Sequence, residues 1–86
     1  MNERERFNKL IRKLRKKKEV RVHMHMSLYD DAWLRIYEVN GGRLGKCIVD
    51  VSDEEEANLY RRASNDIRMI LIWEERKSEK KNGKVD

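Results

Sequence analysis

The chain has 86 residues and a net charge of +5, a length that provides for one small domain with a modest hydrophobic core. No stretch approaches the roughly 18 to 20 apolar residues of a membrane span. The charged start MNERERFNKL lacks the apolar segment of a secretory signal, so none is expected. Cys47 is the only cysteine, which excludes an internal disulfide framework. A single cysteine is typical of a reducing compartment, and we expect a cytoplasmic protein.

Positive charge is concentrated at the two ends of the chain. Residues 1–26 contain ten Lys or Arg against three Asp or Glu, residues 27–75 are acidic overall, and residues 76–86 are basic again. Such asymmetry indicates an acidic partner, most commonly nucleic acid. A highly charged surface of mixed sign is also the ordinary exterior of a soluble protein.

The first segment has the periodicity of an amphipathic helix. Phe7, Leu10, Ile11 and Leu14 follow the i, i+3, i+4, i+7 spacing of one helical face. Asn2 is a capping residue with a glutamate three positions later, and acids lie in the first turn and lysines in the last turn, as the helix dipole prefers. The pattern predicts a helix over residues 3–17.

The period changes to two in the stretch VRVHMHMSL, which predicts a strand over residues 20–28. The valines, the methionines and Leu28 are expected to face the core, with the histidines on the other side. Residues 29–31 form a predicted turn, and two further strands are predicted over residues 32–39 and 43–51. The residues Asn40-Gly41-Gly42 between these strands are suited to a tight hairpin turn.

A two-residue turn in this hairpin predicts which side chains share a face of the sheet, because residues directly opposite each other point the same way. The predicted core face contains Ala32, Leu34, Ile36, Cys47, Val49 and Val51. The predicted outer face contains Trp33, Arg35, Tyr37, Lys46 and Ile48.

The last long element is predicted to be one helix over residues 52–76. Ser52 and Glu55 have the spacing of a capping box, and the stripe Ala57, Tyr60, Ser64, Ile67, Leu71, Glu74, with Ala63 and Ile70 beside it, follows helical periodicity. The alternative is a fourth strand over residues 67–73, where IRMILIW has strand-like composition. The polar residues 77–86 are predicted to be a disordered basic tail, outside a single domain over residues 1–76.

The expected fold is therefore α+β, in the order α-β-β-β-α. It consists of a three-stranded antiparallel sheet with both helices on its apolar face.

Metal binding and catalysis receive little support from the sequence. His23 and His25 project from one side of a strand, but a zinc site needs three or four ligands, and Cys47 is predicted on the opposite face. Because Cys47 and the histidines are predicted on opposite faces, they are also not expected to form a thiol–imidazole pair for nucleophilic catalysis. No glycine-rich phosphate loop is present. We expect neither a cofactor nor an enzyme.

The predicted outer face has the composition of a nucleic-acid-binding surface. Cationic side chains neutralise phosphates, and aromatic rings stack on bases. The candidate contacts on the sheet are Arg21, His23, His25, Trp33, Arg35, Tyr37 and Lys46. Sequence-independent attraction is expected from Arg12, Lys13, Lys16, Lys17 and Lys18. We therefore expect a DNA- or RNA-binding module.

A protein partner is the alternative. A lysine-rich helix end is often only a solvated surface, and aromatic residues on a sheet also mark protein interfaces. Under this alternative, Trp33 and Tyr37 are expected to be buried by the second helix or by another copy of the chain. A small inhibitor or adaptor of the kind that phages or mobile elements encode fits this alternative, with contacts through the acidic residues 52–56. Self-association through residues 67–73 is a further, compatible expectation.

The order α-β-β-β-α resembles that of the double-stranded-RNA-binding domain. That family has basic residues at the start of its last helix, where this chain has Asp53-Glu54-Glu55-Glu56, so the family's phosphate contact is missing. With Arg21, Arg35 and Trp33 facing outward, the sheet also resembles the integrase-arm and AP2-type domains. That resemblance implies a sheet lying in the major groove of DNA.

Overall fold

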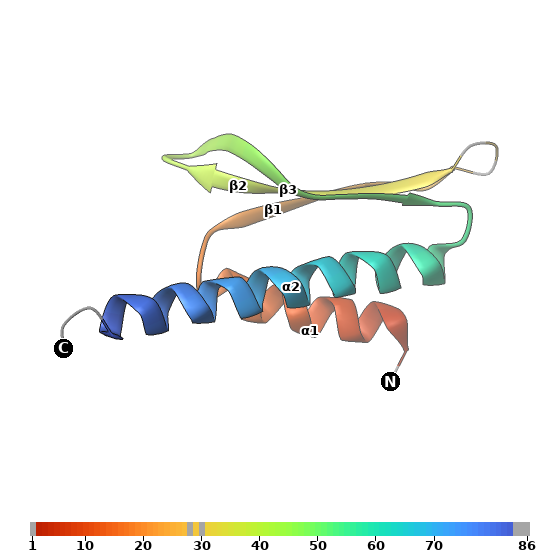
Figure 1. The fold of residues 1–86 in the computed structure, drawn as a ribbon. Helices are drawn as coiled ribbons and strands as arrows, with labels where there is room; N and C mark the ends of the chain where they lie inside the picture. Colours follow the sequence, from red (N-terminus) through yellow and green to blue (C-terminus); the bar gives the residue numbers. More distant parts are fainter. Residues whose placement is uncertain (1, 28, 30, 84–86) are drawn as a thin grey trace.

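Two helices lie side by side on one face of a three-stranded antiparallel sheet (Figure 1). The structure is a computed structural model that describes residues 2–27, 29 and 31–83, the last six by their backbone alone. The elements are α1 (Glu3–Arg15), β1 (Val20–His25), β2 (Ala32–Asn40), β3 (Arg43–Asp53) and α2 (Glu56–Gly83). The predicted α+β fold and its element order are confirmed, and residues 67–73 are helix rather than strand. The predictions for Leu28, Asp30 and residues 84–86 lie outside the described residues.

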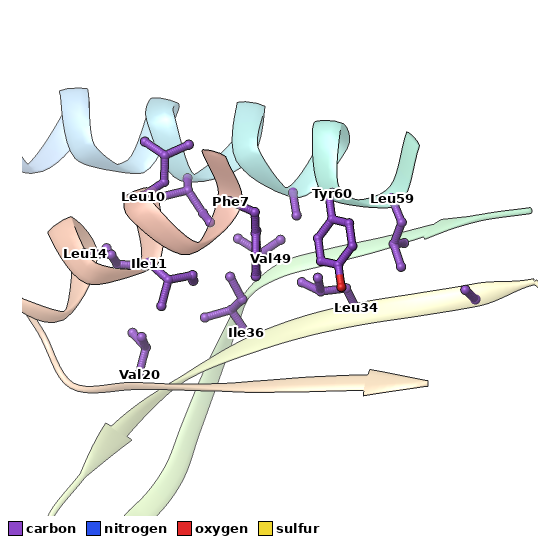
Figure 2. Close-up of a cluster of buried hydrophobic side chains, with 13 residues drawn as sticks. Phe7, Leu10, Ile11, Leu14, Val20, Leu34, Ile36, Val49, Leu59 and Tyr60 are labelled. Atoms are coloured by element: carbon purple, nitrogen blue, oxygen red, sulfur yellow. The ribbon is translucent and has the colours of Figure 1, made fainter. Parts of the chain in front are cut away.

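The core lies between the two helices and the sheet (Figure 2). The predicted stripe of α1 is buried as expected, and the backbone N–H of Glu5 donates to Oδ1 of Asn2 over 2.8 Å, which caps the helix. The sheet's Leu34 and Ile36 are completely buried. The buried residues of this core are Phe7, Leu10, Ile11, Leu14, Val20, Ala32, Leu34, Ile36, Val49, Leu59, Tyr60, Ala63 and Ile67.

Met24 and Met26 are more exposed than predicted. The strand ends at His25, so Met26 lies beyond it and is 45% exposed. Met24 is 37% exposed, although its sulfur accepts a hydrogen bond from the buried Tyr60 over 4.0 Å. β1 is an edge strand, and of the three strands α2 packs mainly on β3 and, to a lesser extent, on β2. The free end of β1 therefore extends beyond the cover of the helices.

In β3, the side chains near the hairpin turn lie on other faces of the sheet than predicted. Leu34 pairs with Val51 and Ile36 with Val49, but two register shifts follow, so that Tyr37 pairs with Cys47. An extra residue in one strand reverses the direction of the side chains beyond it. Cys47 is consequently exposed rather than in the core. Ile48, predicted to face outward, is partly buried and packs against the core.

The boundaries of α2 also differ from the prediction. Ser52 belongs to β3, opposite Trp33, so the predicted capping box does not form. Instead, Oδ1 of Asp53 accepts a hydrogen bond of 2.9 Å from the backbone N–H of Glu55, which lowers the pKa of Asp53. At its other end α2 continues to Gly83. Residues 77–83 are therefore helical where a disordered tail was predicted.

Candidate nucleic-acid interface

The face of the sheet opposite the helices carries the candidate side chains of β1 and β2 that the sequence predicted there, but not Lys46 or Ile48 of β3. Each of three neighbouring pairs joins one residue of β1 to one of β2. The pairs are Arg21 with Tyr37, His23 with Arg35, and His25 with Trp33. Figure 1 shows both helices on the other face, so neither covers this surface. We call these six residues the outer face.

Trp33 is the centre of a stacked group on the outer face. The Arg35 guanidinium carbon lies 4.6 Å from the centroid of the Trp33 ring, a cation–π contact. The His25 ring stacks on Trp33 with 5.7 Å between centroids and 20° between planes. Trp33 itself is half-buried by these neighbours. Three flat groups are therefore held together on an open surface.

Asp50 of β3 holds the guanidinium of Arg35 from the other side. Nε of Arg35 donates to Oδ1 of Asp50 over 3.2 Å, and this contact raises the pKa of Arg35. The Arg35 side chain remains 41% exposed and that of Asp50 63%. The carboxylate orients the guanidinium and also reduces the positive charge of the outer face.

A second aromatic pair lies beside this group. The rings of His23 and Tyr37 are tilted by 55° with their centroids 5.2 Å apart, and both side chains are half-buried. Arg21, opposite Tyr37, is exposed. The pair extends the run of rings along the outer face toward the start of β1.

The cations at the end of α1 are contiguous with the outer face at Arg21. Arg12, Lys13, Lys16 and Lys17 are exposed. A hollow of about 560 Å³ is lined by residues 15–21, which places the lysines of the turn beside Arg21. Positive charge therefore continues from the helix end to the edge of the outer face.

Lys18 differs from the neighbouring lysines because it is engaged in ion pairs. Its Nζ lies 2.8 Å from Oε1 of Glu74 and 3.3 Å from Oε2 of Glu38. The hydrogen bond to Glu74, and then the one to Glu38, raise the pKa of Lys18 and keep it charged. Since two carboxylates already surround this ammonium, it is a weaker candidate for phosphate contact than Lys16 or Lys17.

Lys46 lies apart from the outer face, at the irregular end of β3. It is exposed and lines a groove together with Trp73 and Lys77 of α2. Sequence reasoning did not associate these two residues with the site. Their i, i+4 spacing places them on one side of a helix, but that spacing alone does not reveal that Lys46 faces them.

The described residues offer no arrangement for metal chemistry. Among the side chains that the structure describes, no three His, Cys, Asp or Glu residues gather closely enough to hold a metal ion. The thiol of Cys47 donates a hydrogen bond to the carbonyl oxygen of Val49 over 3.2 Å. Across residues 2–27, 29 and 31–83, no helix combines the length and the apolar character needed to cross a membrane.

No family model, no curated protein and no solved structure matches this chain. The topological resemblances noted above therefore remain resemblances of architecture alone.

Proposed function

We propose that the protein is a non-enzymatic module that binds nucleic acid through the outer face of its sheet. The observation that carries this proposal is the stack of His25, Trp33 and Arg35 on a surface that neither helix covers. Aromatic rings and guanidinium planes bind bases by stacking, and exposed cations bind the phosphates.

The charge next to the outer face supports the same proposal. The exposed Lys16 and Lys17 lie beside Arg21 in one hollow, so a phosphate backbone that reaches the rings also meets these cations. Binding that uses such contacts weakens steeply with salt, because each neutralised phosphate releases counterions. Replacing Lys16 by Gln is expected to weaken binding to all sequences alike and to reduce the salt dependence.

The decisive experiment replaces Trp33 by Ala and measures affinity for labelled single- and double-stranded DNA and RNA at several salt concentrations. We expect about a tenfold loss of affinity, since a stacked base contributes about 1–3 kcal/mol. The matched control is Tyr29→Ala, which removes a 94% exposed aromatic ring located beyond the end of β1. If the unaltered protein shows no salt-dependent affinity for any of these nucleic acids, the proposal is wrong.

The second candidate is a protein-interaction module, such as an inhibitor or adaptor. It is favoured by the exposed carboxylates of Glu54, Glu55 and Glu56 at the start of α2, which form an acidic surface suited to a basic partner. Under this alternative, Trp33→Ala leaves any affinity for nucleic acid unchanged. The same titration therefore separates the two functions.

A further inference from the structure

A groove of about 480 Å³ separates the irregular end of β3 from the second half of α2, on the helical side of the molecule. On the β3 side it is lined by Lys46, Cys47 and Ile48, and on the α2 side by Ile70, Trp73 and Lys77. Its volume lies within the range of small-molecule sites. The register shifts of β3 create this groove, because they direct Ile48 toward the core and leave Lys46 facing α2.

Trp73 makes one wall of the groove a flat aromatic surface. Its side chain is 64% exposed, and Nζ of Lys77 lies 5.4 Å from the centroid of its ring. With this exposure, the indole offers flat aromatic area on which a base can stack. The opposite wall, Ile48, is apolar and partly buried.

The charges around the groove favour an anionic occupant. Glu38, Glu74 and Lys18 also line it and together carry one net negative charge, which Lys46 and Lys77 outweigh. Lys46 and Lys77 are exposed and border the aromatic wall. An aromatic surface beside two lysines complements a nucleotide, whose base stacks while its phosphate accepts hydrogen bonds from ammonium groups.

We infer that this groove binds one unpaired base of a single-stranded nucleic acid, with Trp73 as the stacking surface and Lys46 and Lys77 as the phosphate contacts. This inference rests on the proposed function and adds the class of nucleic acid. Within a duplex the faces of each base are covered by its neighbours, so stacking on Trp73 requires an unstacked base.

The groove is continuous with the outer face across the edge of β3. Cys47 pairs with Tyr37 of the outer face and also lines the groove. A strand whose bases contact Trp33 and Tyr37 therefore reaches Trp73 by passing over this edge. The two tryptophans are the only ones in the chain, so each reports on one end of this path.

A second copy of the chain is a poorer occupant. The exposed apolar residues of this part of α2 are Met69, Ile72 and Trp73, too few to supply the roughly 800 Å² that each partner buries in a stable interface. Lysines are also depleted in protein interfaces, whereas two of them border Trp73.

The test uses Trp33→Phe, which leaves Trp73 as the only tryptophan. Titration with a single-stranded oligonucleotide is expected to quench its fluorescence, and a duplex of the same sequence is expected to quench it much less. In the otherwise unaltered protein, Trp73→Ala is expected to lower single-strand affinity about tenfold. The double variant with Lys46→Gln and Lys77→Gln is expected to have a shallower salt dependence. The slope of the logarithm of the binding constant against the logarithm of the salt concentration should fall in magnitude by up to about 1.4. The control is Ile72→Ala, a nearby exposed side chain that does not line the groove.

The outcomes separate this inference from the proposed function. If Trp33→Ala weakens binding while Trp73→Ala does not and Trp73 fluorescence is unchanged, the groove inference is overturned and the proposed function stands. If Trp73→Ala alone weakens binding, the groove is supported and the outer face is not. A Trp73 emission shift that depends on protein concentration without oligonucleotide, and that Ile72→Ala abolishes, assigns the groove region to a second copy and overturns the inference.

Discussion

Nζ of Lys18 lies 2.8 Å from Oε1 of Glu74 and thereby connects the turn after α1 to the second half of α2. The same ammonium reaches Glu38 of β2, so one side chain joins the turn after α1 to both α2 and the sheet. All three side chains are about three-quarters buried. Partly buried groups of this kind interact more strongly than surface ion pairs, because water screens them less.

Replacing Lys18 by Met is expected to destabilise the protein by about 1 kcal/mol, since it leaves two partly buried carboxylates without their cation. Urea denaturation measures the change in the free energy of unfolding. The matched control is Lys16→Met, at an exposed position, which is expected to change stability by less than about 0.5 kcal/mol. Equal losses in the two variants would show that the ion pairs add no stability.

The contribution of the Lys18–Glu74 ion pair to the stability of the protein depends on pH. The hydrogen bond from Lys18 lowers the pKa of Glu74 below its ordinary value of 4.5. A carboxyl group with a lowered folded-state pKa stabilises the protein above its unfolded pKa, and this stabilisation is lost as the pH falls through the lowered value. The difference in the free energy of unfolding between the unaltered protein and Lys18→Met should therefore have its full size at pH 6 to 7. Denaturation curves should converge once the pH falls well below 4.5. A difference that persists unchanged in acid contradicts the assignment.

Asp50 has two opposing effects on the outer face: it orients the guanidinium of Arg35, and it reduces the positive charge. Its ion pair with Arg35 is exposed, so Asp50→Asn is expected to change stability little. The substitution removes a carboxylate that repels phosphates, and affinity for nucleic acid should rise severalfold with a steeper salt dependence. Binding curves at several salt concentrations measure both effects. Weaker binding would instead mean that Asp50 acts mainly by positioning the guanidinium.

Ser64 is a polar residue in the core that offers a gain in stability. It is 1% exposed, and its Oγ has no hydrogen-bond partner among the residues that the structure describes. Ser64→Ala removes this buried hydroxyl and raises helix propensity, and it should stabilise the protein by about 0.5–1 kcal/mol. The reverse change at the adjacent buried position, Ala63→Ser, should destabilise by about 1–2 kcal/mol. Thermal denaturation of the two variants gives the comparison.

Local patterns predicted the α1 stripe and the regular part of the hairpin correctly. Phe7 to Leu14 repeat with the helical period, and Ala32 to Ile36 alternate with the strand period. The outer positions of Trp33, Arg35 and Tyr37 followed from that alternation. These predictions succeeded because each depends on residues that are neighbours in the chain.

The errors arose where distant residues determine the structure. Ser52 and Glu55 have the local signature of a helix start, yet pairing with Trp33 keeps Ser52 in the sheet. The alternation of β3 gives no indication of its register shifts, because each shift is defined by the partner residue on β2. The ion pairs of Lys18 could not be predicted for the same reason, since both of its acidic partners are distant in sequence.

The sequence by itself determined the α+β class, the order of the elements, the α1 core stripe and the basic, aromatic character of one sheet face, because short-range periodicity specifies them. Only the tertiary structure decided that Cys47 is exposed, that Lys18 is held by Glu38 and Glu74, and that Lys46 faces Trp73 across a groove. The physical reason is that strand register and helix packing bring together residues far apart in the chain, and no local pattern encodes those contacts.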